Sequence, residues 1–528
     1  MLTGLTGLNR QILNCSSSPL TLSRSFSTSY PKTCEFCEGS IVSKSSISPG
    51  FENPNLMEAY KKAKPSCGDT ISNLPDDLLC RILSSLSTKE AALTSILSKR
   101  WSNLLLSIPI LDLDDSVLLN PQKGRRKNVF FKAFVDRLLS LRVETSSPVQ
   151  RVSLKCRQGG VEPDRILKWI LTIVRDLGVL DLSLRVDCGI FHLPFQVFRS
   201  KTLVNLRIGT MIRLSQFPSD VISPTLNSLV LDLVEFRVED KVRFKQILSA
   251  FPSLQNLRIH ESTKWKFWNG SASSTGTLKS LTYRCDDDCS APKPCVSFDS
   301  PSLVYLEYSD MVADKYENLK LDSLVEARID LHMTAFQIMR KPNHIGFVSG
   351  DVTTLFNGIR NVKILCLSPD ALEAIYYRGE RLPVFNNLIS LSLGSDKPHG
   401  SPFIFWKKLP SLLNNSPNLE TLTIKGLVHY VAEGWDNLSP MSRLCFSWDD
   451  VSASMSSSAV KVLEITRYNG SCQEVKQIMH FMGKLSRLQM VRVHHKAVDE
   501  GEKSRLMRGI LLLSEASKCE IQVMKETV

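Results

Sequence analysis

The segments Leu203-Val-Asn-Leu-Arg-Ile208, Leu226-Asn-Ser-Leu-Val-Leu231 and Leu254-Gln-Asn-Leu-Arg-Ile259 repeat one short pattern, with apolar residues at the first, fourth and sixth positions. Alternation between apolar and polar residues at the end of each segment is typical of a strand with one buried face. The starts of successive units are mostly 21 to 31 residues apart. The other units begin at Ile108, Val149, Val179, Leu278, Leu303, Leu324, Val362, Leu388, Leu419, Val460 and Leu488.

A period of this length is that of leucine-rich repeats, in which every unit supplies one strand and one returning segment. Proline phrases such as Phe251-Pro-Ser-Leu254 and Ser416-Pro-Asn-Leu419 end the returning segment and set the turn into the strand. Helices are expected on the outer face at residues 242–250 and 405–413. The asparagine that regular repeats carry after the strand is mostly missing, so we expect an irregular solenoid with exposed loops at 261–277 and 286–294.

A different pattern precedes the repeats, because residues 69–106 indicate three short helices. We expect Asn73 to cap the first helix, with Pro75 in its first turn. Ser87 and Glu90 have the spacing of a capping box for the second helix. Roughly 38 residues cannot bury all the leucines and isoleucines of this segment among themselves. Part of its apolar surface must therefore contact another domain or another chain.

The stretch from Asp69 to Trp101 resembles the F-box of the large plant F-box/leucine-rich-repeat family. In that family the Leu-Pro pair, the first helix and the tryptophan region bind a Skp-type adaptor. The resemblance implies that the adaptor-binding residues are Leu74, Pro75, Leu78, Leu79, Ile82, Leu83, Leu97 and Trp101. A second tryptophan that family members usually carry is replaced here by the run Leu104–Leu106, which leaves an apolar contact in its place.

The C-terminal part is similar to the FBD module that closes many members of the same family. Residues 474–485 and 501–517 are its expected helices, between strands that end in Glu520-Ile-Gln-Val523. The predicted fold class is α/β: a short three-helix F-box, an irregular leucine-rich-repeat solenoid and a C-terminal α/β FBD segment. The predicted domains are a Ser-rich extension at 1–68, the F-box at 69–115, the repeats at 116–445 and the FBD at 446–528.

Composition excludes several classes of protein. The 528 residues include no apolar run long enough to span a bilayer, and the 14 cysteines are scattered as in a protein with reduced thiols. The net charge of +12 is densest at Lys123–Lys127. This cluster fits a nuclear-import signal, a contact for an acidic partner or a solvated loop. Aromatic residues do not interleave with the basic ones, so nucleic-acid binding is not favoured. We expect no cofactor and no catalytic residues, because none of the familiar catalytic motifs is present. We expect no metal, because Cys34 and Cys37 have zinc-like spacing but no second pair of ligands.

The first residues leave two alternatives open. Up to Cys34 they contain Arg10, Arg24 and Lys32 and no acidic residue, which fits an organellar transit peptide. The alternative is a dispensable extension, with translation starting at either Met1 or Met57. Because the F-box belongs to a cytosolic or nuclear machine, we expect the protein in the nucleus, the cytoplasm or both.

The resemblance implies a non-catalytic function. The F-box would bind the adaptor and through it a cullin, while the repeats would bind a target protein for ubiquitination and proteasomal degradation. An F-box scaffold that degrades nothing is the alternative, and an imported organellar repeat protein is a third hypothesis. Arg207, Asn227, Gln255 and Lys279 are candidate target contacts on the strand face. The sequence does not identify the target, or whether it must first be modified or needs a small co-ligand.

Overall fold

The computed structural model describes residues 71, 73–94, 98–116, 127–156, 160–187, 191–209, 212–214, 222–236, 249–261, 271–273, 276–285, 292–334, 337–338, 350–378, 382–394, 402–426, 455–496, 499–515 and 519–526. They belong to one compact unit that runs from Ile71 to Val528. Among the described helices, none combines the length and the apolar character that crossing a bilayer requires.

The main element is a fifteen-stranded sheet in which every described strand pair is parallel and the strands follow one another in chain order. Every predicted repeat unit forms one of these strands, and β21 adds the strand predicted at the C-terminus. The strands are β1 (Ile110–Asp114), β2 (Arg151–Cys156), β3 (Asp181–Val186), β5 (Asn205–Gly209), β7 (Ser228–Asp232), β9 (Asn256–Glu261), β11 (Ser280–Cys285), β13 (Tyr305–Met311), β15 (Glu326–His332), β16 (Ile364–Leu367), β17 (Ser390–Leu393), β18 (Thr421–Lys425), β19 (Val462–Thr466), β20 (Met490–His495) and β21 (Glu520–Lys525).

The repeat pattern places its leucines in rows that run across the strands. Leu206, Leu229 and Leu257 are register partners on neighbouring strands, and each is at most 1% exposed. Burying one such side chain stabilises the fold by roughly 1.5–3 kcal/mol. A leucine in such a row packs mainly against the repeats on either side of its own, so no repeat forms its core alone.

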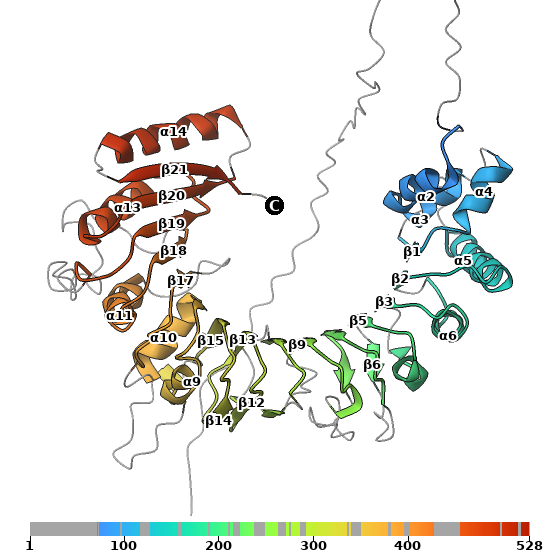
Figure 1. Cartoon of the computed structure of the whole chain (residues 1–528), viewed down its shortest axis with the longest axis horizontal. Coiled ribbons are helices and arrows are strands. Elements are labelled where there is room, and N and C mark those ends of the chain that lie inside the picture. Colours follow the sequence, from blue (N-terminus) through green and yellow to red (C-terminus); the bar gives the residue numbers. More distant parts are fainter. Residues whose placement is uncertain are drawn as a thin grey trace, which may run out of the picture. The chain divides into compact units, whose positions relative to one another are not determined.

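The returning segments are of two kinds, which confirms the expected irregularity. Helices return the chain near both ends of the sheet, and Figure 1 shows them covering one of its faces. They are α5 (Lys127–Glu144), α6 (Pro163–Arg175), α9 (Thr353–Gly358), α10 (Pro369–Arg378), α11 (Pro402–Asn414), α13 (Cys472–Lys484) and α14 (Glu500–Glu515). In the middle, 3₁₀-helix η1 (Phe195–Arg199) and two small parallel sheets, β4-β6-β8 and β10-β12-β14, take this role. Their strands are β4 (Phe191–His192), β6 (Ile212–Leu214), β8 (Glu235–Phe236), β10 (Ser271–Ser273), β12 (Val296–Asp299) and β14 (Tyr316–Lys320).

The proline phrases form the predicted turns. The Leu254 amide donates to the Phe251 carbonyl at 3.0 Å, and the Leu419 amide donates to the Ser416 carbonyl at 3.2 Å. Proline at the second position of such a turn already has the required φ and has no amide to satisfy. The predicted helices at 405–413, 474–485 and 501–517 are confirmed within one to three residues as α11, α13 and α14. Of the helix predicted at 242–250, only residues 249–250 are described, and both are helical.

The two expected loops are partly wrong. Glu261 is 3% exposed at the end of β9, and the short strand β10 lies inside the first segment. Lys293, in the second segment, is 7% exposed, donates to the Tyr283 hydroxyl at 2.9 Å and forms an ion pair with Asp310. Tyr283 in turn donates to Glu261 at 2.7 Å. Charged residues suggested solvated loops, whereas Glu261 and Lys293 are buried and the charge of Lys293 is neutralised by Asp310 of β13.

The predicted F-box helices are confirmed as α2 (Asp76–Ser85), α3 (Thr88–Thr94) and α4 (Lys99–Leu105). The capping box is also confirmed: the Ser87 amide donates to the Glu90 carboxylate at 3.0 Å, and the Glu90 amide donates to the Ser87 hydroxyl at 3.3 Å. The prediction that Asn73 caps α2 was wrong, because Pro75 occupies the cap position and no side chain bonds there. Helix α2 therefore begins at Asp76, one residue after Pro75, and Pro75 does not lie in its first turn as predicted.

Two buried contacts join the helices to the first repeats. The Arg142 side chain, from α5, is fully buried and donates to the carbonyls of Leu105 and Ile108 at 2.9 and 2.7 Å. Burial lowers the pKa of Arg142 to about 10, so the guanidinium keeps its charge at neutral pH. The Asp112 amide of β1 donates to the Thr88 hydroxyl at 2.6 Å. The three helices are thereby attached directly to the sheet.

We expect Arg142→Met to lower the apparent free energy of unfolding by about 2 kcal/mol. Two buried carbonyls lose a charged donor, and this loss exceeds the gain from removing a desolvated guanidinium. Urea unfolding of the purified chain measures the effect. Arg137→Met, an exposed position on the same helix, is the matched control. Equal unfolding midpoints for the two variants would show that Arg142 does not hold this junction.

Candidate functional site

The first candidate site is an exposed apolar face of α2. Leu78 and Ile82 lie one helical turn apart, and their exposed fractions are 44% and 43%. Pro75 is exposed just before the helix begins. Large apolar side chains so open to water on one helix face are typical of a protein-binding surface.

Other residues of the predicted adaptor-binding set lie beneath this face. Leu79 and Leu83 are fully buried and Trp101 is 7% exposed, all three in a small core of their own. Leu74 is partly buried and packs against that core. Leu97 lies outside the described residues. Burial thus divides the predicted set: Pro75, Leu78 and Ile82 offer surface, whereas Leu79, Leu83 and Trp101 hold the helices that present it.

A polar clamp orients the Leu-Pro turn at one end of this face. Arg100 of α4 donates to the Leu74 carbonyl and forms an ion pair with Asp76, both at 2.6 Å. The Arg100 and Asp76 side chains are 40% and 64% exposed, so the ion pair itself adds little stability. Its consequence is geometric, because it ties the start of α2 to α4.

The second candidate site is the open face of the main sheet, where polar and charged side chains alternate with the buried leucines. Neighbouring strands pair these charges: Arg151 meets Asp181 and Arg492 meets Glu464, each at 2.9 Å. Of the four predicted target contacts, Arg207 lies on this face and is exposed. Asn227, Gln255 and Lys279 each stand one residue before a strand, at least partly exposed. Their role in binding stays a prediction.

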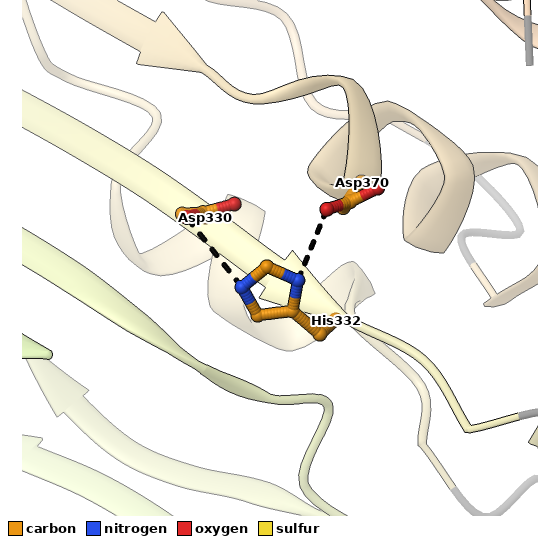
Figure 2. Close-up of side chains that lie close together, drawn as sticks. All are labelled: Asp330, His332 and Asp370. Atoms are coloured by element: carbon orange, nitrogen blue, oxygen red, sulfur yellow. Dashed lines mark ion pairs between the residues drawn. The ribbon is translucent and has the colours of Figure 1, made fainter. Parts of the chain in front are cut away.

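A third cluster was not predicted from the sequence. Figure 2 shows the His332 ring between two carboxylates, Asp330 on the same strand and Asp370 at the start of α10. The His332 Nδ1 atom is 3.0 Å from Asp370, and its Nε2 atom is 3.5 Å from Asp330. Asp330 also accepts a hydrogen bond from the Ser309 hydroxyl at 3.1 Å. The three residues come from two segments of the chain, so no local motif reveals the cluster.

The electrostatics of this cluster favour a bound proton. Hydrogen bonds to Asp330 and Asp370 raise the pKa of His332 to about 10, even though burial opposes the charge. Burial raises the pKa of Asp330, but hydrogen bonds from His332, Ser368 and Ser309 outweigh it and lower that pKa. His332 is therefore an imidazolium at neutral pH, which links β15 to α10.

These three residues also lie close enough to one another to hold a metal ion, with ligand atoms within 4.8 Å. The geometry favours the proton instead. The two ring nitrogens face different carboxylates, so the protonated ring can donate to one carboxylate from each nitrogen (Figure 2). The absence of a metal site remains a prediction.

Comparison with known proteins identifies the helical segment. The F-box domain family matches residues 71–113. An F-box protein of Arabidopsis thaliana is 81% identical over 475 residues, which cover 89% of this chain and 100% of that protein. An F-box/LRR-repeat protein of the same plant is 39% identical over 86% of this chain and 98% of its own length. A putative F-box/FBD/LRR-repeat protein, also from Arabidopsis thaliana, is 39% identical over 87% of this chain and 90% of its own length.

The His332 cluster predicts a pH-dependent stability. Because the pKa of this histidine is raised from 6.5 to about 10 in the folded chain, its stabilisation is complete below about pH 6.5 and is lost as the pH rises through 10. His332→Gln should lower the free energy of unfolding at pH 6.5 by about 2 kcal/mol, and the difference from wild type should vanish above pH 10. Thermal unfolding from pH 6 to 10.5 measures it. His192→Gln, an exposed position on β4, is the control. A difference in free energy of unfolding between His332→Gln and wild type that stays constant across this pH range would contradict a charged His332.

Proposed function

The chain belongs to the plant F-box/leucine-rich-repeat family, and from this we propose that it is the substrate-recognition subunit of a Skp–cullin–F-box ubiquitin ligase. Its F-box would bind a Skp-type adaptor, and its repeats would bind the target protein. The exposed Leu78 and Ile82 side chains on α2 are the observation that carries the proposal. They form an apolar surface on the one segment that matches the F-box family.

The proposed adaptor interface is built from the exposed members of the predicted set. Leu78, Ile82 and Pro75 would insert into the adaptor, where burial of each large side chain contributes roughly 1.5–3 kcal/mol. Leu86, which follows α2, and Leu93 of α3 are 38% and 45% exposed and would add further apolar surface for the adaptor. Leu79, Leu83 and Trp101 would act indirectly, by keeping α2 packed on α4.

In this proposal the chain performs no chemistry of its own. The target, held on the repeats, would be presented at high effective concentration to a conjugating enzyme carried by the cullin. Such presentation works best if the adaptor site and the target site are rigidly connected. The buried bonds from Arg142 to the Leu105 and Ile108 carbonyls make that connection. We place this function in the nucleus, the cytoplasm or both, where such ligases operate.

We expect the double variant Leu78→Glu with Ile82→Glu to bind the Skp-type adaptor with at least tenfold lower affinity than the wild type. Two carboxylates would have to be desolvated in an apolar interface, while the folded chain tolerates them because both positions face water. Co-purification and titration with the recombinant adaptor measure the loss. Leu511→Glu with Leu512→Glu, at exposed positions on α14, introduces the same charge as a matched control.

Adaptor binding by the charged α2 variant at wild-type strength would contradict this assignment of the interface. A second comparison separates contact from folding. Leu83→Ala should weaken adaptor binding and also lower the melting temperature, because Leu83 is fully buried, whereas the α2 surface variant should leave the melting temperature unchanged.

The rival function is a scaffold that binds the adaptor and degrades nothing. If the chain recruits targets for degradation, proteins labelled by proximity to it should accumulate severalfold when the Leu78 and Ile82 variant replaces the wild type. Blocking the cullin or the proteasome should produce the same accumulation in wild-type cells. Labelled proteins whose abundance is insensitive to all three treatments would favour the scaffold.

A further inference from the structure

The middle of the open sheet face is formed by strands β5, β7 and β9. Parallel register places Arg207, Val230 and Arg258 side by side on these three strands. Both arginines are exposed, and Val230 between them is partly exposed. Asn205, Ser228 and Asn256 form the neighbouring row on one side. Arg207, Val230 and Arg258 together form the arginine row.

The arginine row differs from the residues that stand in register with it on the other strands of the sheet. The charged side chains that stand in register with this row on other strands are all engaged. Asp112 is near Lys155, Glu307 pairs with Arg284, Arg328 pairs with Glu326, and Glu464 pairs with Arg492. Arg207 and Arg258 have no ion pair or hydrogen bond from their side chains to any residue that the structure describes. Two guanidinium groups with open donors thus stand two strands apart.

The surroundings do not neutralise this charge. On the open face of β5, β7 and β9, the only carboxylate among the described residues is Asp232, and its partners are already assigned. Its Oδ1 atom is 2.9 Å from His260 Nδ1, and its Oδ2 atom is 3.9 Å from Arg185. Lys279, exposed one residue before the neighbouring strand β11, adds no negative charge either. The arginine row is therefore a local excess of positive charge.

The spacing of the two arginines limits what they can bind together. Two strand separations place their backbones about 9.6 Å apart. A polyproline-type chain rises about 3.1 Å per residue with three residues per turn, so side chains three residues apart point the same way about 9.3 Å apart. A fully extended strand presents same-side residues about 6.8 or 13.6 Å apart, which fits poorly.

The side chains of the arginine row and its neighbours determine which chemical groups a ligand must carry. The planar fork of an arginine matches a carboxylate with two parallel hydrogen bonds. The exposed amides of Asn205 and Asn256 offer further donors to a peptide backbone, although Asn256 also donates weakly to Asn227 at 3.3 Å. Val230 supplies a small apolar contact between the two charges. These features fit an acidic peptide that crosses the strands.

We propose that Arg207 and Arg258 bind an acidic segment of the target in which two carboxylates are three residues apart, in a polyproline-like conformation. The proposal rests on the proposed function as a target receptor and names the class of target. Glutamate or aspartate supplies the negative charge, and no prior modification of the target is needed.

The test uses the full chain in complex with its adaptor and fluorescent peptides of the form Gly-Glu-Pro-Pro-Glu-Gly, with Lys-Pro-Pro-Lys, Glu-Pro-Glu and phosphoserine versions beside them. Fluorescence anisotropy should show binding of the three-residue glutamate spacing and at least fivefold weaker binding of the other glutamate spacing and of the lysine peptide. The double variant Arg207→Ala with Arg258→Ala should bind the glutamate peptide with at least tenfold lower affinity. Added salt should lower the affinity of the wild-type chain for the same peptide.

Arg492→Ala is the matched control, since it removes an arginine of the same line whose charge is already paired with Glu464, and it should leave peptide affinity within twofold of wild type. Equal affinity of wild type and the double variant would overturn the proposal, as would binding of phosphoserine peptides with none of glutamate peptides. Adaptor co-purification is recorded for every variant. If the wild-type chain binds the adaptor but not the glutamate peptide, only this inference is wrong. If the wild-type chain does not bind the adaptor, the proposed function is wrong.

Discussion

The fold depends on one constraint: the leucine rows of the main sheet are buried between successive repeats. Leu229 of β7, for example, is covered by its register partners Leu206 and Leu257. Because each strand is stable only against the next, the sheet extends from β1 through β21 without interruption among the described strands. The terminal repeats must therefore be supported by other elements. At the N-terminal end, α3 and Arg142 of α5 provide that support.

This constraint explains why the F-box helices and the repeats form one unit. Thr88 and Arg142 satisfy a strand amide and two carbonyls that would otherwise be buried without partners where the helices meet β1. A receptor that works by proximity benefits from such a junction, because a loose connection would spread the target over many positions. The apolar core of the F-box helices is small, so its stability draws on the sheet beside it.

The sequence predicted those features whose signal lies within a few neighbouring residues. Strand positions followed from the apolar pattern, turns from the proline phrases, and the Ser87–Glu90 capping box from its spacing. Helix α5 was missed although Phe131, Val135, Leu138 and Leu139 repeat with helical period, because the basic residues before it suggested a loop. The His332 cluster and the buried Lys293–Asp310 pair were missed for a different reason. Their members are brought together only by the stacking of repeats, and no local pattern encodes that.

For the adaptor site, a pattern of apolar residues identifies the right helix but does not separate contact from core. Leu78 and Leu79 are adjacent and chemically identical, yet one is 44% exposed and the other is fully buried. The same separation holds on the strands, where Leu206 must pack against its neighbours while Arg207 beside it is free to contact a partner. In a repeat sheet, the residues of one strand thus alternate in role: the buried ones stabilise the fold, and the exposed ones between them select the target. Changes on the open face are therefore expected to alter binding without disturbing the rows beneath.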